Sequence, residues 1–305
     1  MQPERILVTG AGGFVGRHLL PALRLILPGA ELFTQWVDVT DFQALAGVVS
    51  VAKPDVCVHL AAVAAIPAAR QNPDHAWTVN LHGTLNLANA IKLHAPACVL
   101  VFISSADGYG ASFRAGTPLN EEAPLAPLNV YGATKAAADL ALGAMAQDGL
   151  HAIRLRPFNH TGPGQSDEFM VAAFARQIAR IRLGLQEPVL NVGALDPYRD
   201  ILDVRDVCTA YAISVAQAKS IAPGTILNLA SGTPRRVGSV LQQLLLVAGV
   251  DAEIKTDPAR LRPSDIPMAC GDAAKARGQL GWAPAIPWEK TLQDVVEDWL
   301  VRMRV

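Results

Sequence analysis

The sequence predicts an α/β fold: a doubly wound parallel sheet with a smaller C-terminal lobe. Through the first half of the chain, apolar runs of strand length alternate with segments of helix length. A cluster of glycines separates the first apolar run from the first helical segment. Strands that alternate with helices form parallel sheets, because each helix returns the chain to the starting edge of the sheet.

Five strands and three long helices are expected in this first half. The apolar runs that predict strands are Arg5 to Thr9, Glu31 to Thr34, Asp55 to Leu60, Ala97 to Ile103 and His151 to Arg156. The segments that predict helices are Phe14 to Leu27, Asp74 to Leu93 and Val130 to Gln147.

Beyond Pro157 the alternation becomes irregular, and pieces rich in glycine and proline separate the remaining helices. These helices are expected at Phe169 to Leu183, Val204 to Gln217, Val237 to Ala248 and Trp288 to Met303. We therefore expect residues 1–160 to form mainly the sheet domain. Residues 161–305 would form mainly the smaller lobe, interleaved with late strands of the sheet.

Composition excludes several classes of protein. A chain of 305 residues buries roughly three quarters of its unfolded surface, enough for an enzyme-sized core. Lys and Arg number 26 against 27 for Asp and Glu, so no net field attracts nucleic acid or an anionic membrane. The most apolar interior stretch, Val58 to Ala69, is too short to span a bilayer and contains Pro67.

The cysteines and the start of the chain indicate a cytoplasmic protein. Cys57, Cys98, Cys208 and Cys270 are far apart and show neither a zinc spacing nor a disulfide framework. The chain runs from Met1 directly into its first strand, without the pattern of a secretion signal. We expect a soluble protein without a metal site.

The glycine cluster is suited to a dinucleotide. Gly10, Gly12, Gly13 and Gly16 follow a strand and open a helix. In that context glycines allow a tight turn and a close approach of phosphate to backbone N–H groups, and the helix N-terminus favours negative charge.

The end of the second strand leaves the choice of coenzyme open. An acidic residue that hydrogen-bonds the adenosine ribose is expected there, yet Thr34-Gln-Trp36 contains neither an acidic residue nor an arginine. Asp38 follows a little later and could meet the adenine amino group. Alternatively, Asp38 could cap the helix after Thr40 or be solvated.

Two further features carry potential chemistry. Ser105 follows an apolar strand, so its hydroxyl lies at the carboxyl edge of the sheet, where it could bind a carbonyl or only satisfy a turn. Tyr131 and Lys135 are four residues apart, which on a helix places both on one face. An ammonium there can lower the pKa of the phenol and make it a proton donor or acceptor.

In that chain order, these motifs resemble the extended short-chain dehydrogenase/reductase family, whose members act on nucleotide-linked sugars. The resemblance covers nearly the whole chain. It rests on the glycine loop, His59-Leu-Ala-Ala62, Asn80, Ser104-Ser105, Tyr131 to Lys135, Arg156-Pro-Phe158, Arg199-Asp200 and Arg262-Pro263. The run Arg156 to Gln165, followed by Phe174 to Ala179, is similar to the GDP-4-keto-6-deoxymannose reductases.

The resemblance implies a catalytic triad of Ser105, Tyr131 and Lys135. Tyr131 would protonate a sugar ketone as hydride arrives from NADPH or NADH at carbon 4, Lys135 would hold the nicotinamide ribose, and Ser105 would orient the ketone. The coenzyme would lie in a Rossmann domain. Its further contacts would be Gly10, Gly12, Gly13, Phe14, Val15, Gly16, Asp38, Val39, Leu60, Ala61, Ala62, Pro157 and Phe158.

The resemblance also implies a GDP-sugar substrate bound by the smaller lobe. Asn159, Arg199 and Arg262 would bind it, with Ser105 and Asp107 near the ketone. His160 could contact the substrate or could only fix its loop through a hydrogen bond. For Arg199, the alternative to binding the substrate is a surface salt bridge with Asp200.

Asp107 stands where related dehydratases carry a glutamate, and its shorter side chain favours simple reduction to a GDP-6-deoxyhexose such as GDP-D-rhamnose. His59 is expected to be a core histidine, and Asn80 to fix a backbone segment or water near the site. The family resemblance further implies a homodimer formed by two long helices of each subunit.

Two alternatives stay open. One is a nucleotide-sugar 4-epimerase or 4,6-dehydratase with tightly held NAD, which uses the same three residues but consumes no coenzyme. The other is a non-catalytic sensor of dinucleotides. A sensor has no need of Ser105, Tyr131 and Lys135 together.

Overall fold

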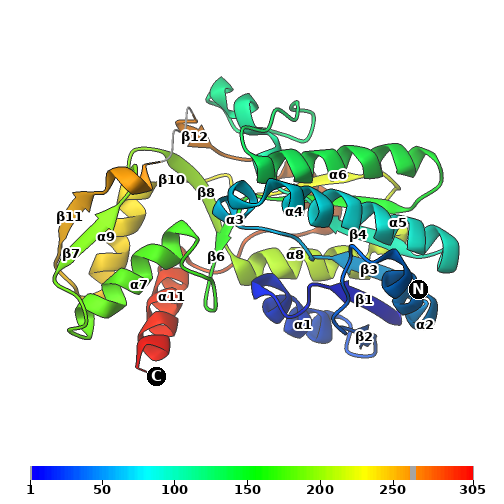
Figure 1. Ribbon diagram of the computed structural model, residues 1–305, viewed down its shortest axis with the longest axis horizontal. Coiled ribbons are helices and arrows are strands. Elements are labelled where there is room, and N and C mark those ends of the chain that lie inside the picture. Colours follow the sequence, from blue (N-terminus) through cyan, green and yellow to red (C-terminus); the bar gives the residue numbers. More distant parts are fainter. Residues whose placement is uncertain (1, 262–265, 305) are drawn as a thin grey trace.

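The computed structural model describes residues 2–261 and 266–304, and a six-stranded parallel sheet is its central feature (Figure 1). The strand order is β2-β1-β3-β4-β5-β9, and every neighbouring pair is parallel. The strands are β1 (Arg5–Thr9), β2 (Glu31–Phe33), β3 (Val56–His59), β4 (Val99–Ile103), β5 (Ala152–Pro157) and β9 (Ile226–Leu229). The predicted doubly wound sheet is confirmed.

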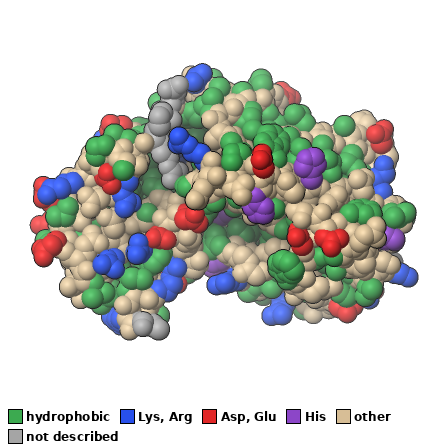
Figure 2. Space-filling model, in the orientation of Figure 1, with side chains coloured by type: hydrophobic (Ala, Val, Ile, Leu, Met, Phe, Trp, Pro, Cys, Tyr) green, Lys and Arg blue, Asp and Glu red, His purple; other side chains and the backbone are tan. Residues whose placement is uncertain are grey.

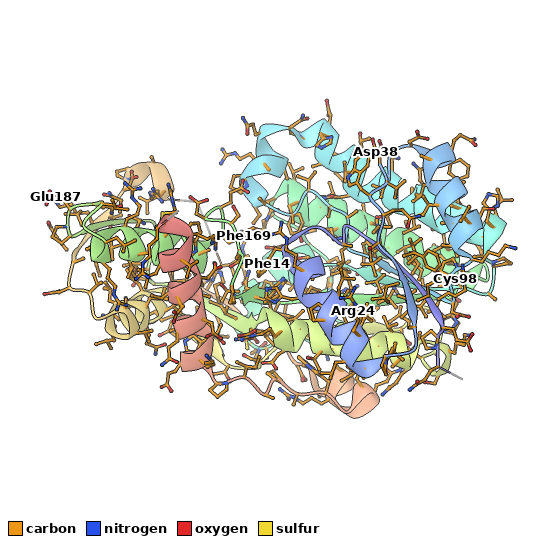
Figure 3. The ribbon with its side chains drawn as sticks, turned by 90° about the horizontal axis from the view of Figure 1, so that it is seen from below. Phe14, Arg24, Asp38, Cys98, Phe169 and Glu187 are labelled. Atoms are coloured by element: carbon orange, nitrogen blue, oxygen red, sulfur yellow. The ribbon has the colours of Figure 1, made fainter. Side chains whose placement is uncertain are left out.

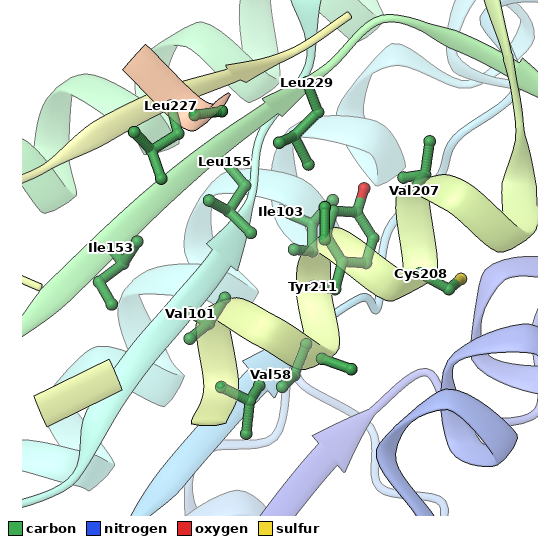
Figure 4. Packing of buried hydrophobic residues seen from close by; sticks show 14 of the residues in the cluster. Val58, Val101, Ile103, Ile153, Leu155, Val207, Cys208, Tyr211, Leu227 and Leu229 are labelled. Carbon is green, nitrogen blue, oxygen red and sulfur yellow. The ribbon is translucent and has the colours of Figure 1, made fainter. Parts of the chain in front are cut away.

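Helices cover both faces of this sheet, which explains its apolar strands. On one face lie α1 (Phe14–Ile26) and α8 (Val204–Ala216), and on the other α2 (Phe42–Ala52), α5 (Gly83–His94) and α6 (Val130–Gln147). Figure 4 shows Tyr211 of α8 among the strand residues Val101 and Ile103. Side chains alternate along each strand, so both faces of the sheet are core.

The long helix expected over Asp74 to Leu93 is divided. It consists of α4 (Pro73–Trp77), a π-helical turn (Thr78–His82) and α5. Asn80 in that turn is buried; its Oδ1 accepts from Val63 N (2.8 Å), and its Nδ2 donates to Val63 O (3.1 Å) and Thr134 Oγ1 (2.9 Å). Asn80 thus ties the segment after β3 to α6, in agreement with its expected backbone-fixing role.

Two helices of the first half were not among the expected elements. These are α2 and α3 (Ile66–Gln71). Asp41 caps α2, because its Oδ1 accepts from Ala44 N at 3.0 Å. Of the alternatives left open for Asp38, that of a cap for this helix is therefore wrong, because Asp41 is the cap.

The smaller lobe contains short strands and three packed helices. β7 (Val189–Val192) pairs with β11 (Glu253–Thr256), and β8 (Tyr198–Asp203) with β6 (Asn159–Thr161), β10 (Pro234–Arg236) and β12 (Met268–Ala269). The helices α7 (Met170–Arg182), α9 (Val237–Ala248) and α11 (Trp288–Met303) share one core. A shorter helix, α10 (Ala274–Leu280), packs near β9.

The two parts are interleaved in sequence, since α8 and β9 return to the sheet after the lobe has begun. Figure 2 shows the surface hollowed between the lobe and the sheet domain. Within the described part of the chain, no helix has the length and apolar composition needed to cross a membrane.

Candidate active site

The strand order places a ligand crevice beside β1. β1 has β2 on one side and β3 on the other, so the winding of the sheet reverses there. Doubly wound proteins bind ligands outside the carboxyl ends of the strands at that point. The glycine loop follows β1, and Leu60, Ala61 and Ala62 follow β3.

The glycine loop fits a dinucleotide diphosphate. Gly10 has φ +71°, and a Cβ there would lie 2.7 Å from Ala61 N, while a Cβ on Gly16 would lie 2.2 Å from Ala11 O. A Cβ on Gly12 would meet no atom within 4 Å. Gly10 and Gly16 therefore permit close backbone contacts, and the loop faces open space at Gly12, before the N-terminus of α1.

Other expected coenzyme residues are placed less directly. Phe14 and Val15 open α1 and are partly buried, and Pro157 ends β5. Val39 packs in the core against Gly83, and the Phe158 ring is buried in an aromatic cluster. The side chains of Val39 and Phe158 are therefore part of the core.

The carboxylate of Asp38 is hydrogen-bonded within its own turn. Its Oδ1 accepts from Thr40 N (2.9 Å) and Thr40 Oγ1 (2.8 Å), and these two bonds lower the pKa of the carboxyl. Asp38 lies on an exposed edge of the sheet domain (Figure 3).

The three expected catalytic residues come together at the carboxyl end of β4. Ser105 begins the 3₁₀ turn Ala106–Gly108 and accepts from Asp107 N at 3.1 Å. Tyr131 and Lys135 lie on the first turns of α6, whose cap Asn129 accepts from Gly132 N at 2.8 Å. The Ser105 hydroxyl lies near enough to the Tyr131 phenol to lower the pKa of the phenol.

The electrostatics of Tyr131 differ from the expectation. Burial and the Asp107 carboxylate raise the pKa of the phenol above its ordinary value, and the Ser105 hydroxyl lowers it only in part. Sequence spacing alone predicted a lowered pKa, because it shows the helical neighbour but not the burial. Tyr131 is therefore protonated at neutral pH, the form that donates a proton.

Lys135 is 3% exposed and lies beneath the crevice. Its Nζ is 4.4 Å from the centroid of the Phe102 ring. Burial lowers the pKa of Lys135 to about 7, and the Asp139 carboxylate opposes that shift. His59 nearby bridges Thr9 and Thr84, and burial lowers its pKa to about 3, so it is the expected neutral core histidine.

The lowered pKa of Lys135 predicts that Lys135→Met stabilises the protein. Folding at neutral pH disfavours the ammonium, so we expect the free energy of unfolding to rise by roughly 2–4 kcal/mol at pH 7 and below. The gain should shrink as the pH rises from about 7 toward 10.5, where the unfolded lysine also loses its proton. Urea unfolding of both proteins at about pH 6.5 and about pH 9.5 tests this. An equal gain in the free energy of unfolding at the two pH values contradicts it.

Asp107 and Arg199 face one another across the site. Ser105 Oγ donates to Asp107 Oδ2 at 3.4 Å. Burial raises the pKa of the Asp107 carboxyl, whereas Ser105 and the Arg199 guanidinium lower it in part. Arg199 Nη1 also donates to Tyr198 O at 2.7 Å, which aims the guanidinium from β8.

The remaining expected substrate residues lie on the lobe side. Asn159 is exposed and opens β6, which pairs with β8. His160 Nδ1 is 3.0 Å from Phe158 O and its ring stacks on Phe14, which agrees with a loop-fixing role. Arg262 lies outside the residues that the structure describes.

Comparison with known proteins identifies the family. The model of the GDP-mannose 4,6 dehydratase family matches residues 27–295. The chain belongs to this family, within the extended short-chain dehydrogenases/reductases. GDP-6-deoxy-D-mannose reductase of Pseudomonas aeruginosa is 36% identical over 99% of each chain. UDP-glucose 4-epimerase of Azospirillum brasilense is 28% identical over 96% of this chain and 94% of its own. The solved structure of RMD from P. aeruginosa with NADPH has a TM-score of 0.86 and 33% identity, covering 98% and 99% of the two chains.

Behind the triad of this family member lies a buried charge network that the sequence did not indicate. Asp139, one helical turn beyond Lys135, is fully buried. Its carboxylate accepts from Arg154 Nη1 (3.1 Å) and from Arg156 Nε (2.9 Å) and Nη2 (2.8 Å). Arg154 and Arg156 both belong to β5, so the network joins α6 to β5.

A second buried carboxylate positions Arg199. Asp200 Oδ1 accepts from Ser231 N (2.9 Å) and Oγ (2.6 Å), and Oδ2 from Gly232 N (2.9 Å) and Gly271 N (3.3 Å). These bonds hold β8 against two neighbouring segments. Asp200 is fully buried, so a surface salt bridge with it does not describe Arg199.

A pocket of about 370 Å³ between α7 and β7 is separate from the site. Arg176, Arg180 and Arg260 line it, and each guanidinium already has an acceptor on a neighbouring side chain. Glu187, another lining residue, lies at the outer end of the lobe, far from Phe14 (Figure 3). Among residues 2–261 and 266–304, no three His, Cys, Asp or Glu side chains gather to hold a metal ion.

Proposed function

We propose that the protein reduces the 4-keto group of GDP-4-keto-6-deoxy-D-mannose to a GDP-6-deoxyhexose, GDP-D-rhamnose, with hydride from NADPH or NADH. It is an NAD(P)-dependent oxidoreductase. The observation that carries the proposal is 36% identity over 99% of both chains to GDP-6-deoxy-D-mannose reductase. The juxtaposition of Ser105, Tyr131 and Lys135 beside the glycine loop supports it.

The coenzyme is held by the sheet domain, mainly residues 1–160. Gly10 to Gly16 and the N-terminus of α1 bind its diphosphate, and the segment after β3, from Leu60 to Ala62, lies beside the nicotinamide half. The bound coenzyme supplies hydride to carbon 4 of the sugar. Lys135 binds the nicotinamide ribose from below, since its ammonium lies under the crevice.

Tyr131 is the proton donor. Its raised pKa keeps the phenol protonated at neutral pH, and the Ser105 hydroxyl nearby orients it toward the ketone. As the ketone oxygen gains negative charge, Tyr131 gives it a proton and Ser105 donates a hydrogen bond to it.

The smaller lobe, mainly residues 161–305, binds the nucleotide sugar. Arg199 and Arg262 bind the diphosphate of the substrate, and Asn159 a sugar hydroxyl or phosphate. Asp107 lies between the catalytic residues and Arg199, so its carboxylate shapes the charge around the ketone without entering the proton transfer.

The working form is proposed to be a cytoplasmic homodimer that binds neither nucleic acid nor membrane. α5 and α6 carry the exposed side chains of Leu93 (65%) and Leu140 (60%), which suit a pairing of these helices between subunits. The four cysteines are free and buried, consistent with a reducing compartment. Light scattering after gel filtration tests the dimer.

Arg199→Ala is expected to raise KM for the nucleotide sugar by about tenfold or more, because a charge-assisted bond to phosphate is lost. KM for the coenzyme should change by less than about twofold. Steady-state kinetics in both substrates measures this. A parallel rise of both KM values contradicts a substrate role and assigns Arg199 to the structure of β8.

The experiment that tests the function mixes the purified protein with GDP-4-keto-6-deoxymannose and NADPH or NADH. Oxidation of one coenzyme per sugar, with a GDP-6-deoxyhexose identified by NMR, supports the proposal. No oxidation, together with interconversion of UDP- or dTDP-hexoses, favours an epimerase or dehydratase instead.

A further inference from the structure

Arg17 is an unassigned basic residue at the mouth of the glycine loop. It lies on the first turns of α1, and its side chain is exposed. Arg17 Nε donates to Gly12 O at 3.1 Å, which folds the guanidinium back over the loop. Within the described residues, its Nη nitrogens have no hydrogen-bond or ion-pair partner. The loop thus carries an available guanidinium beside the open space at Gly12.

The end of β2 lies beside the glycine loop that Arg17 contacts. β1 and β2 pair with Leu7 opposite Phe33, so the segment after Phe33 runs beside the start of the glycine loop. In doubly wound proteins the adenosine ribose lies between these two segments. Thr34, Gln35 and Trp36 are all exposed there and carry no charge.

The two carboxylates that follow β2 are already engaged. Asp38 accepts from the backbone and hydroxyl of Thr40, and Asp41 accepts from Ala44 N as the cap of α2. A coenzyme site selective for NAD places an acid on the ribose hydroxyls, whereas an arginine nearby accommodates a 2′-phosphate. Here both acids that directly follow β2 are engaged and an arginine lies at the glycine loop, which is the pattern of a site for a 2′-phosphate.

We infer that Arg17 binds the 2′-phosphate of the coenzyme and makes NADPH the preferred reductant. The guanidinium offers a fork of N–H donors that matches a phosphate. Its bond to Gly12 O holds the fork in place before the ligand arrives, which reduces the entropy lost on binding. This inference rests on the coenzyme use proposed above and specifies its selectivity.

The test measures binding of 2′,5′-ADP and of 5′-AMP by calorimetry, without sugar nucleotide or turnover, because these two ligands differ only in the 2′-phosphate. The wild-type protein should bind 2′,5′-ADP about tenfold or more tightly than 5′-AMP, which is the contribution of one charge-assisted contact. Arg17→Gln should remove that difference and leave the affinity for 5′-AMP within about twofold. Arg17→Lys should keep part of the preference, because the charge remains.

Arg24→Gln is the matched control, since Arg24 is an exposed arginine at the other end of α1 (Figure 3). It should alter neither affinity. In kinetics, Arg17→Gln should raise KM for NADPH and leave KM for NADH unchanged.

Equal wild-type affinity for the two nucleotides overturns the inference, as does an equal loss of both in Arg17→Gln. Either result leaves the proposed reductase intact. Failure to bind any adenine nucleotide overturns the coenzyme site itself, and with it both proposals.

Discussion

Tyr131→Phe is expected to lower kcat for ketone reduction by about 10³-fold, the usual worth of a positioned proton donor. The ring still fills its place on α6, so coenzyme affinity should stay within about twofold. The variant keeps Ser105 as a donor to the ketone oxygen but has no acid to complete the alcohol. Loss of reduced coenzyme at saturating nucleotide sugar measures turnover, and titration with 2′,5′-ADP measures binding.

Tyr198→Phe provides the comparison, because Tyr198 is a partly exposed tyrosine on β8 outside the triad. It should retain nearly full turnover. Because the pKa of Tyr131 is raised, reduction by the wild-type enzyme should show no loss of rate from phenol ionisation below about pH 10. Full turnover in Tyr131→Phe contradicts the assigned role and leaves water or another side chain as the donor.

The strands β1 to β5 of the sheet could be predicted because they coincide with runs rich in apolar residues, whereas β9 was not among the expected strands. The run Arg5 to Thr9 coincides with β1, and the helices expected at Val130 to Gln147, Val237 to Ala248 and Trp288 to Met303 coincide with α6, α9 and α11. These segments have a local signal, either a continuous apolar run or a helical period.

The strands of the lobe could not be predicted in the same way. β6 and β10 contain three residues each, and β12 only two, so none shows an alternating pattern. β7 and β11 pair although more than 50 residues separate them in the chain, and all four residues of β11 are exposed. Such pairings depend on tertiary contacts rather than on local sequence.

In the candidate site, too, the features set by local sequence could be predicted and those set by tertiary contacts could not. Four-residue spacing placed Tyr131 and Lys135 together, since helical geometry is local. The pKa of Tyr131 was misjudged because burial and the Asp107 carboxylate are tertiary features. Asp139 was missed because its partners Arg154 and Arg156 lie on another segment of the chain. Arg17 was missed because its place beside the open space at Gly12 is a feature of the fold, which spacing in the sequence does not show.

Asp139→Asn is expected to lower the free energy of unfolding by about 3–5 kcal/mol, the range for breaking a buried ion pair. The side chains of Arg154 and Arg156 are 11% and 3% exposed, so both guanidiniums would remain buried beside a neutral amide. Near the site, Lys135 would lose the carboxylate that favours its charged form. Urea unfolding and the pH dependence of turnover measure the two effects.

The pH dependence separates this charge effect from a change of shape. The guanidiniums hold the pKa of Asp139 below its ordinary value, so its stabilisation is present above about pH 4 and is lost as the pH falls through the folded-state pKa. The difference between wild type and Asp139→Asn should therefore narrow in acid. Glu31→Gln, which breaks an exposed pair with Arg5, should change stability by less than about 1 kcal/mol. If both substitutions have the same small effect, the Asp139 network does not hold α6 to the sheet, and Lys135 must be positioned by packing on Phe102.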